Sequence, residues 1–223
     1  MTVSLVLVVC AFLLTHFLMS GPLRKTLIGT LGEQGFLLLY SLVSICLLGA
    51  AIVLFARSPA EHLLWDGTHP VAWALASVLT VLGTGLFLPS FQRNPALPGV
   101  KAAGLATVIP SGVYTITRHP MMWAITLWSL GHIIVAPSLR TLILLGGMIV
   151  LALVGSHLQD KRKVAGNTRE FGPWQRRTSF WPQLQNLGKL KLTWLTALLI
   201  WFLVTMIHWE LYSIPAGLWM WLV

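Results

Sequence analysis

The fold is decided by residues 35–56, which read GFLLLYSLVSICLLGAAIVLFA without one charged side chain. A helix needs about 20 apolar residues to cross the hydrocarbon core of a bilayer, and this run is long enough. The whole chain is similarly apolar, since 56% of its 223 residues are hydrophobic and only 9% are charged. A soluble domain would carry roughly 25% charged residues. The composition therefore excludes a cytosolic enzyme, a nucleic-acid-binding module and a disordered chain, and predicts an all-α polytopic membrane helix bundle.

Further apolar runs on both sides of this one predict about six transmembrane helices. The runs cover residues 3–19, 35–56, 71–91, 121–136, 141–158 and 194–209. The fourth and sixth are short and need interfacial residues to reach across the bilayer. Residues 191–223 are expected to hold the last span and an interfacial C-terminal tail, because Pro215 and Gly217 break the final apolar piece. No repeat or linker divides the chain, so we expect residues 1–223 to form a single membrane domain.

The positive charges predict how the chain is oriented. The first, third and fifth loops hold 13 of the 15 Lys and Arg side chains, and the other loops hold only Arg57 and Arg140. Lys and Arg are enriched in cytoplasmic loops. We therefore expect both termini on the non-cytoplasmic side of a bacterial inner membrane. Topology and anionic lipid headgroups then explain the formal charge of +9, and no nucleic-acid partner is expected.

Histidine is the one recurrent ionisable residue within or beside the apolar runs. An ionisable group at membrane depth is costly and is a candidate for function. His132 follows Pro120 by 12 residues, which places it about 18 Å deeper at the helical rise, and it is the deepest of the 7 histidines. His16 lies about 7.5 Å inside the same face. Spacing alone leaves open whether either residue is a ligand or an interhelical hydrogen-bonding group.

Two neutral imidazoles from different helices can hold an iron porphyrin between them, as in membrane b-type haem proteins. The ring needs apolar walls, and its propionates need cations at a polar rim. Three arginines at the cytoplasmic rim could supply these cations, namely Arg24, Arg93 and Arg118. The spacing thus allows a haem b site with His16 and His132 as axial ligands. Plain core packing suits the same helix faces equally well.

The cytoplasmic mouth of the fourth span is marked by Arg118 and His119, because Pro120 presets the start of a helix. His119 and His157 come to nearly the same depth as His16 and are therefore reserve ligands. A structural interpretation remains for Arg118-His119-Pro120 as well. The motif can simply start a helix and anchor it among lipid phosphates.

Several motifs, in order along the chain, resemble the NnrU family. They are LTHFLMSGPLR at residues 14–24, Arg93-Asn94-Pro95, TRHPMMW at residues 117–123 and LWSLGH at residues 127–132. The resemblance extends over about residues 1–185. The family includes bacterial membrane proteins named for an association with nitrite and nitric oxide reduction. It also includes the plant zeta-carotene isomerase, a haem b enzyme that converts a cis double bond of a carotenoid to trans.

The resemblance implies haem b bound by His16 and His132, because the two axial ligands of the isomerase fall on these positions. The isomerase carries a cysteine three residues before its second ligand, where this chain has Ser129. A ligand switch through sulfur is therefore not expected here. The implied mechanism is redox-gated: reduction loosens one imidazole and opens a site for a polyene or a diatomic gas.

A second set of motifs is similar to the cytoplasmic half of isoprenylcysteine and phospholipid methyltransferases. It comprises Gly112-Val113-Tyr114, Arg118-His119-Pro120, Asp160, Glu170-Phe171-Gly172-Pro173-Trp174 and Phe180-Trp181-Pro182. In those enzymes an Arg-His-Pro helix start and an acidic segment hold S-adenosylmethionine, and Arg118 would suit the cofactor carboxylate. Gln159-Asp160 stands where they carry paired glutamates, so we infer a shared fold ancestry with the cofactor lost.

Three functions therefore stay open from the sequence. They are a haem protein or haem-dependent isomerase, an S-adenosylmethionine-dependent methyltransferase, and a non-catalytic accessory subunit of denitrification. The expected metal ligands are His16 and His132, and the residues expected around the cofactor are Arg24, Arg93, Arg118 and His119. The expected surroundings are the lipid bilayer, with a hydrophobic small molecule or a diatomic gas as the ligand.

Overall fold

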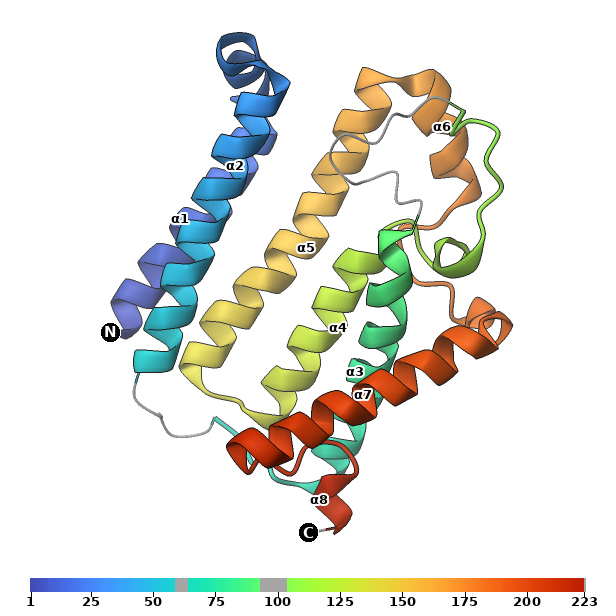
Figure 1. Cartoon of the computed structure of the whole chain (residues 1–223). Helices are drawn as coiled ribbons and strands as arrows, with labels where there is room; N and C mark the ends of the chain where they lie inside the picture. The colour runs from blue at the N-terminus through green and yellow to red at the C-terminus, as the bar shows by residue number, and fades with distance from the viewer. Residues whose placement is uncertain (59–63, 93–103, 223) are drawn as a thin grey trace.

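The computed structural model describes residues 1–58, 64–92 and 104–222, and all regular structure within these ranges is helical (Figure 1). The elements are α1 (Thr2–Ser20), α2 (Arg24–Arg57), α3 (Pro70–Phe87), η1 (Leu88–Phe91), η2 (Gly112–Thr115), α4 (Pro120–Val135), α5 (Leu139–Gly166), α6 (Thr168–Arg177), η3 (Leu184–Lys189), α7 (Lys191–Tyr212) and α8 (Trp219–Leu222). The predicted all-α polytopic bundle is confirmed.

Six apolar helices match the six predicted spans. Five are long and apolar enough to cross a membrane, namely α1, α2, α3 with η1, α5 and α7, and α4 is the shorter sixth. Large apolar side chains point outward from them; Leu7 is 65% exposed, Leu38 62% and Ile45 67%. Apolar patches of this extent are unusual on a water-facing surface and ordinary on one that faces lipid.

The chain ends lie toward one end of the bundle (Figure 1). The turn between α1 and α2 and the short helix α6 lie at the opposite end, which we call the α6 end. Helix α1 packs against α2 and α5, α4 packs against α3 and α5, and α7 packs against α3. This arrangement agrees with an even number of crossings. The orientation expected from the positive charges would put the α6 end on the cytoplasmic side.

Two glycines allow α3, α4 and α7 to approach closely. A β-carbon at Gly85 of α3 would overlap the indole ring of Trp194 on α7. A β-carbon at Gly131 of α4 would lie 3.2 Å from the carbonyl oxygen of Ala76 on α3. Small residues at such contacts let membrane helices gain van der Waals packing where no hydrophobic effect drives association.

A compact apolar cluster closes the bundle at the α6 end. Its buried members are Leu86, Leu105, Val113, Tyr114, Ile116, Trp123, Ala124 and Trp174. The Tyr114 hydroxyl donates a hydrogen bond to the carbonyl oxygen of Ser90 at 3.0 Å. Burial raises the pKa of Tyr114, so this hydroxyl keeps its proton and remains a donor. The contact ties η2 to η1 and makes a firm support for the start of α4.

Two segments refine the boundaries expected from the sequence. Helix α2 begins at Arg24, ahead of the apolar run, and is interrupted at Gly32, whose φ of 70° and ψ of 171° are not helical. Helix α7 ends at Tyr212, and Ser213 adopts a left-handed conformation with φ of 53°. The tail then folds back on α7, where a β-carbon at Gly217 would lie 2.6 Å from the Trp201 ring.

Candidate functional site

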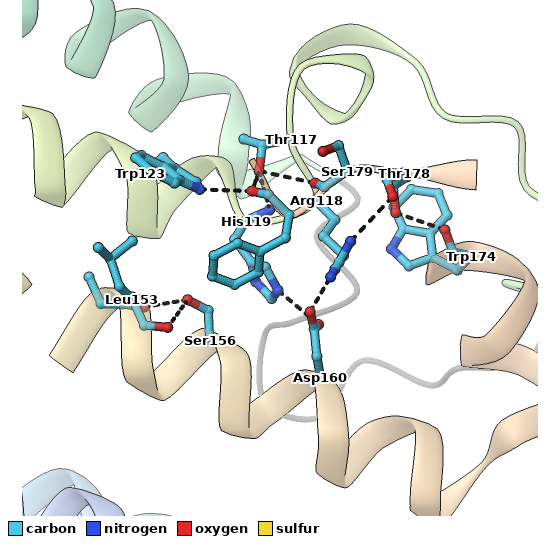
Figure 2. Close-up of polar contacts among 12 residues, drawn as sticks. Thr117, Arg118, His119, Trp123, Leu153, Ser156, Asp160, Trp174, Thr178 and Ser179 are labelled. Atoms are coloured by element: carbon cyan, nitrogen blue, oxygen red, sulfur yellow. Dashed lines mark hydrogen bonds and ion pairs between the residues drawn. The ribbon is translucent and has the colours of Figure 1, made fainter. Parts of the chain in front are cut away.

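The residues just before α4 are fixed by the segment that follows α6 (Figure 2). The backbone N–H of Arg118 donates to the carbonyl oxygen of Ser179 at 2.8 Å. The Thr117 hydroxyl donates to the carbonyl oxygen of Phe180 at 2.7 Å, and the indole N–H of Trp123 donates to the same oxygen at 2.8 Å. Protein contacts therefore position the Arg-His-Pro motif.

Asp160 on α5 holds both polar side chains of the motif (Figure 2). Its Oδ2 accepts a hydrogen bond from Nε of Arg118 at 2.6 Å, and its Oδ1 lies 2.8 Å from Nε2 of His119. Because a carboxylate can only accept, Nε2 of His119 carries a proton. Nη1 of Arg118 also donates to the carbonyl oxygen of Thr178 at 3.2 Å. Both oxygens of Asp160 are thus used by the motif itself.

The three charged or polar side chains of this cluster are shielded from solvent. The exposed fractions are 11% for Arg118, 4% for His119 and 13% for Asp160. The ring of Phe180 covers them, with its centroid 5.5 Å from the guanidinium carbon of Arg118 and 5.5 Å from the imidazole of His119. Shielding lowers the local dielectric and strengthens the ion pair. The cluster therefore clamps the start of α4 to α5.

A cavity of about 340 Å³ lies between the cluster and the α1–α2 hairpin. We call it the His16 cavity; residues that line it include His16, Phe17, Tyr40, Arg118, His119, Met121, Met122, Leu151 and Arg162. Phe17, Met121, Met122 and Leu151 make the apolar part of this wall, and the two arginines supply positive charge. Arg162 also donates a hydrogen bond to the carbonyl oxygen of Ser20, which holds it beside the end of α1.

The tautomer of His16 follows from its contacts. Its Nδ1 lies 3.0 Å from the carbonyl oxygen of Phe12, which can only accept, so Nδ1 carries the hydrogen. Nε2 therefore has a free lone pair. The Ser44 hydroxyl lies 3.3 Å from Nε2 but only 2.6 Å from the carbonyl oxygen of Tyr40, and donates there. The lone pair of His16 is left available.

The structure does not bring His132 to His16. His132 lines a different cavity, of about 290 Å³, together with His208 of α7. The helices run in opposite directions, so His16, near the end of α1, lies toward the α6 end, whereas His132, near the end of α4, lies toward the chain ends (Figure 1). Among the described residues, the two imidazoles therefore share no cavity.

The chain matches the family described as NnrU protein over residues 4–216. The chain belongs to the NnrU family. The resemblance stated from the sequence motifs is thereby confirmed for nearly the whole NnrU chain. No curated protein and no solved structure matches it.

The remaining expected residues of this NnrU-family chain fall in different places. Arg24 lies over the ring of Phe36, 5.2 Å from its centroid, and is not among the residues lining the His16 cavity. Arg93 lies outside the described residues. His157 lines a third cavity, of about 610 Å³, with Arg118, Asp160, Phe180 and Trp181, which we call the His157 cavity.

The sequence did not identify three residues of this region by the parts they play in the structure. Two of them, Tyr40 and Arg162, line the His16 cavity, and the third, Asp160, binds Arg118 and His119. Tyr40 lies inside the uncharged run of residues 35–56, and nothing in one sequence distinguishes it from a packing residue. Asp160 had a usable signal, because it is the single carboxylate of α5 and follows the last apolar residues of that span. A lone carboxylate at a span boundary invites a search for a cationic partner.

Proposed function

We propose that this NnrU-family protein binds haem b in the His16 cavity, with His16 as an axial ligand. The observation that carries the proposal is the tautomer of His16, whose Nδ1–H is bonded to a backbone carbonyl while Nε2 keeps its lone pair beside the cavity. Metal-binding imidazoles show this arrangement, because the second hydrogen bond orients the ring and raises its basicity. His132 has no part in this site, since it lines a separate cavity.

The other lining residues suit the remaining parts of a haem. Phe17, Leu151 and Met122 offer apolar walls, and Arg118 and Arg162 offer cations for the propionates. The thioethers of Met121 and Met122, which line the same cavity, are candidates for a second ligand, a pairing with histidine that haem proteins use. The cavity is partly open, so a planar ring need not fit entirely within it. Haem b would supply a redox-active iron.

The ligand that we propose for this cofactor is a small apolar molecule, either a polyene or a diatomic gas. The proposed setting is a bacterial inner membrane, with a role in nitrogen-oxide metabolism or in cis–trans isomerisation of the polyene. The apolar lining of the cavity, the six apolar helices and the family membership support this proposal.

An absorption spectrum of the full chain, purified in detergent from cells supplied with a haem precursor, tests haem binding. We expect a Soret band and about one haem per chain for the native sequence. His16→Ala should lose the band, and His132→Ala is the matched control that should keep it. A native protein that takes up no haem, even from added haemin, would overturn the proposal. Loss in His132→Ala would instead support the pairing implied by the family resemblance.

A second candidate, binding of S-adenosylmethionine, is favoured by one observation. The His157 cavity combines the cation of Arg118 with the aromatic rings of Phe180 and Trp181, which suit a carboxylate and an adenine base. Binding of labelled S-adenosylmethionine that is lost in Arg118→Ala and kept in His16→Ala would support this function. Absence of binding to the native protein would remove it.

A further inference from the structure

A second pair of histidines lies away from the Arg-His-Pro cluster. His132 of α4 and His208 of α7 line the same cavity of about 290 Å³. Nδ1 of His132 lies 2.8 Å from the carbonyl oxygen of Trp128, and Nδ1 of His208 lies 2.8 Å from that of Val204. Each ring is thus held by the backbone of its own helix, one turn earlier.

These backbone contacts set the same tautomer in both rings. A carbonyl oxygen can only accept a hydrogen bond, so each Nδ1 carries the hydrogen and each Nε2 keeps a lone pair. Among the residues that the structure describes, none donates a hydrogen bond to either Nε2. The two histidines therefore offer two unused acceptors to one cavity.

Trp73 adds an unused donor to the same cavity. Its indole Nε1 is buried and has no hydrogen-bond partner within the described part of the chain, and Trp73 is one of the lining residues. The indole of Trp201, which also lines the cavity, is satisfied, since it donates to the Thr80 hydroxyl at 2.8 Å. Buried donors are rarely left unpaired, so the Trp73 N–H points to an acceptor that the described residues do not provide.

The rest of the lining argues against an ion as the occupant. The described residues that line the cavity include no Lys, Arg, Asp, Glu or Cys. No group of three or more metal-binding side chains occurs among the described residues. The walls are instead apolar and aromatic, as Ala76, Val135 and Trp201 illustrate. Such a lining favours a flat, uncharged ring with a few polar groups.

We propose that the His132–His208 cavity binds a hydroquinone ring. Its two hydroxyl groups donate to Nε2 of His132 and Nε2 of His208, and a hydroxyl oxygen accepts from Nε1 of Trp73. All three unused groups are then satisfied by one molecule. A cavity of about 150 Å³ is enough for benzene, so the larger volume here leaves room for the hydroxyl groups. The proposal is independent of the His16 cavity.

Isothermal titration of the detergent-purified full chain with a short-chain hydroquinone, kept reduced, tests this site. The control ligand is the dimethyl ether of the same compound, which keeps the ring and loses both donors. We expect saturable binding of the hydroquinone and binding of the ether weaker by about tenfold or more. His132→Phe and His208→Phe should each weaken hydroquinone binding about tenfold. His16→Phe, in a different cavity, should leave it unchanged.

Three results would each overturn the proposal. They are no hydroquinone binding by the native protein, equal binding of the hydroquinone and its ether, and native affinity in both His132→Phe and His208→Phe. The comparison of the two ligands needs only the native protein. A variant that fails to fold therefore does not leave the question open.

Discussion

Nε2 of His119 donates a hydrogen bond to Oδ1 of Asp160 at 2.8 Å, which joins the first turn of α4 to the α6 end of α5. The two residues flank different predicted spans, residues 121–136 and 141–158, and the bond is shielded from solvent. The second oxygen of Asp160 accepts a hydrogen bond from Arg118. Because both oxygens bind side chains of the chain itself, the carboxylate stabilises the fold. This relationship leads to the most direct stability test of the cluster.

Replacement of the carboxylate by an amide should destabilise the protein markedly. In Asp160→Asn the shape is kept, but the buried guanidinium of Arg118 loses its counter-charge, which costs about 3 kcal/mol when one partner of a buried pair is removed. The thermal unfolding midpoint in detergent measures the loss. Asp66→Asn is the matched control, because Asp66 is exposed and bonds only to Thr68 within the described residues. Equal midpoints for the two variants would contradict the clamp.

The Thr117 hydroxyl should matter more than an ordinary helix hydroxyl. It donates to the carbonyl oxygen of Phe180 and accepts the backbone N–H of His119 at 3.3 Å. Thr117→Val takes the acceptor away from the buried backbone N–H of His119 and leaves the Phe180 carbonyl with only the Trp123 indole as a donor, so it should cost about 1–3 kcal/mol. Thr196→Val removes an exposed hydroxyl that bonds only within its own helix, and should cost little. Unfolding midpoints measured side by side check the difference.

A methyl group at the contact between α3 and α7 should also destabilise the bundle. Gly85→Ala drives a β-carbon into the Trp194 ring, and overpacking of this kind costs about 1–3 kcal/mol. Gly49→Ala, on α2, meets no atom within 4 Å and should leave stability unchanged or slightly raised. If both variants unfold at the native midpoint, α3 and α7 do not pack as described.

Membrane-impermeant thiol labelling checks the predicted orientation. A cysteine at exposed Gln185, in the segment between α6 and α7, should react only from the cytoplasmic side. A cysteine at exposed Thr68, between α2 and α3, should react only from the opposite side. The native Cys10 and Cys46, which lie within spans, are replaced by Ser for this experiment. Labelling of both positions from one side would reject the topology.

The six spans could be predicted from the sequence because the bilayer dictates apolar length directly. The short run at residues 121–136 became α4, and Pro120 starts that helix as the sequence indicated. The break at Gly32 was not foreseen, since a glycine within a helical pattern is usually tolerated. The family was also recognisable, because its motifs are local in sequence.

The partners across helices could not be predicted. The helical rise gave His16 and His132 different depths, and the structure places them in different cavities. Which residue faces His132 depends on how α7 crosses α3, and no spacing within one chain reveals His208 as its neighbour. Asp160 illustrates the same limit, because its two partners follow from the contact between α4 and α5.

Arg118 forms part of the wall of both the His16 cavity and the His157 cavity. An anionic group bound in either cavity would interact with the same guanidinium of Arg118. This one side chain would therefore couple the two cavities. By thermodynamic linkage, the factor by which the first ligand changes the affinity for the second equals the factor by which the second changes the affinity for the first. A ligand bound in the His157 cavity would therefore change the affinity of the His16 cavity for its own ligand, and the reverse.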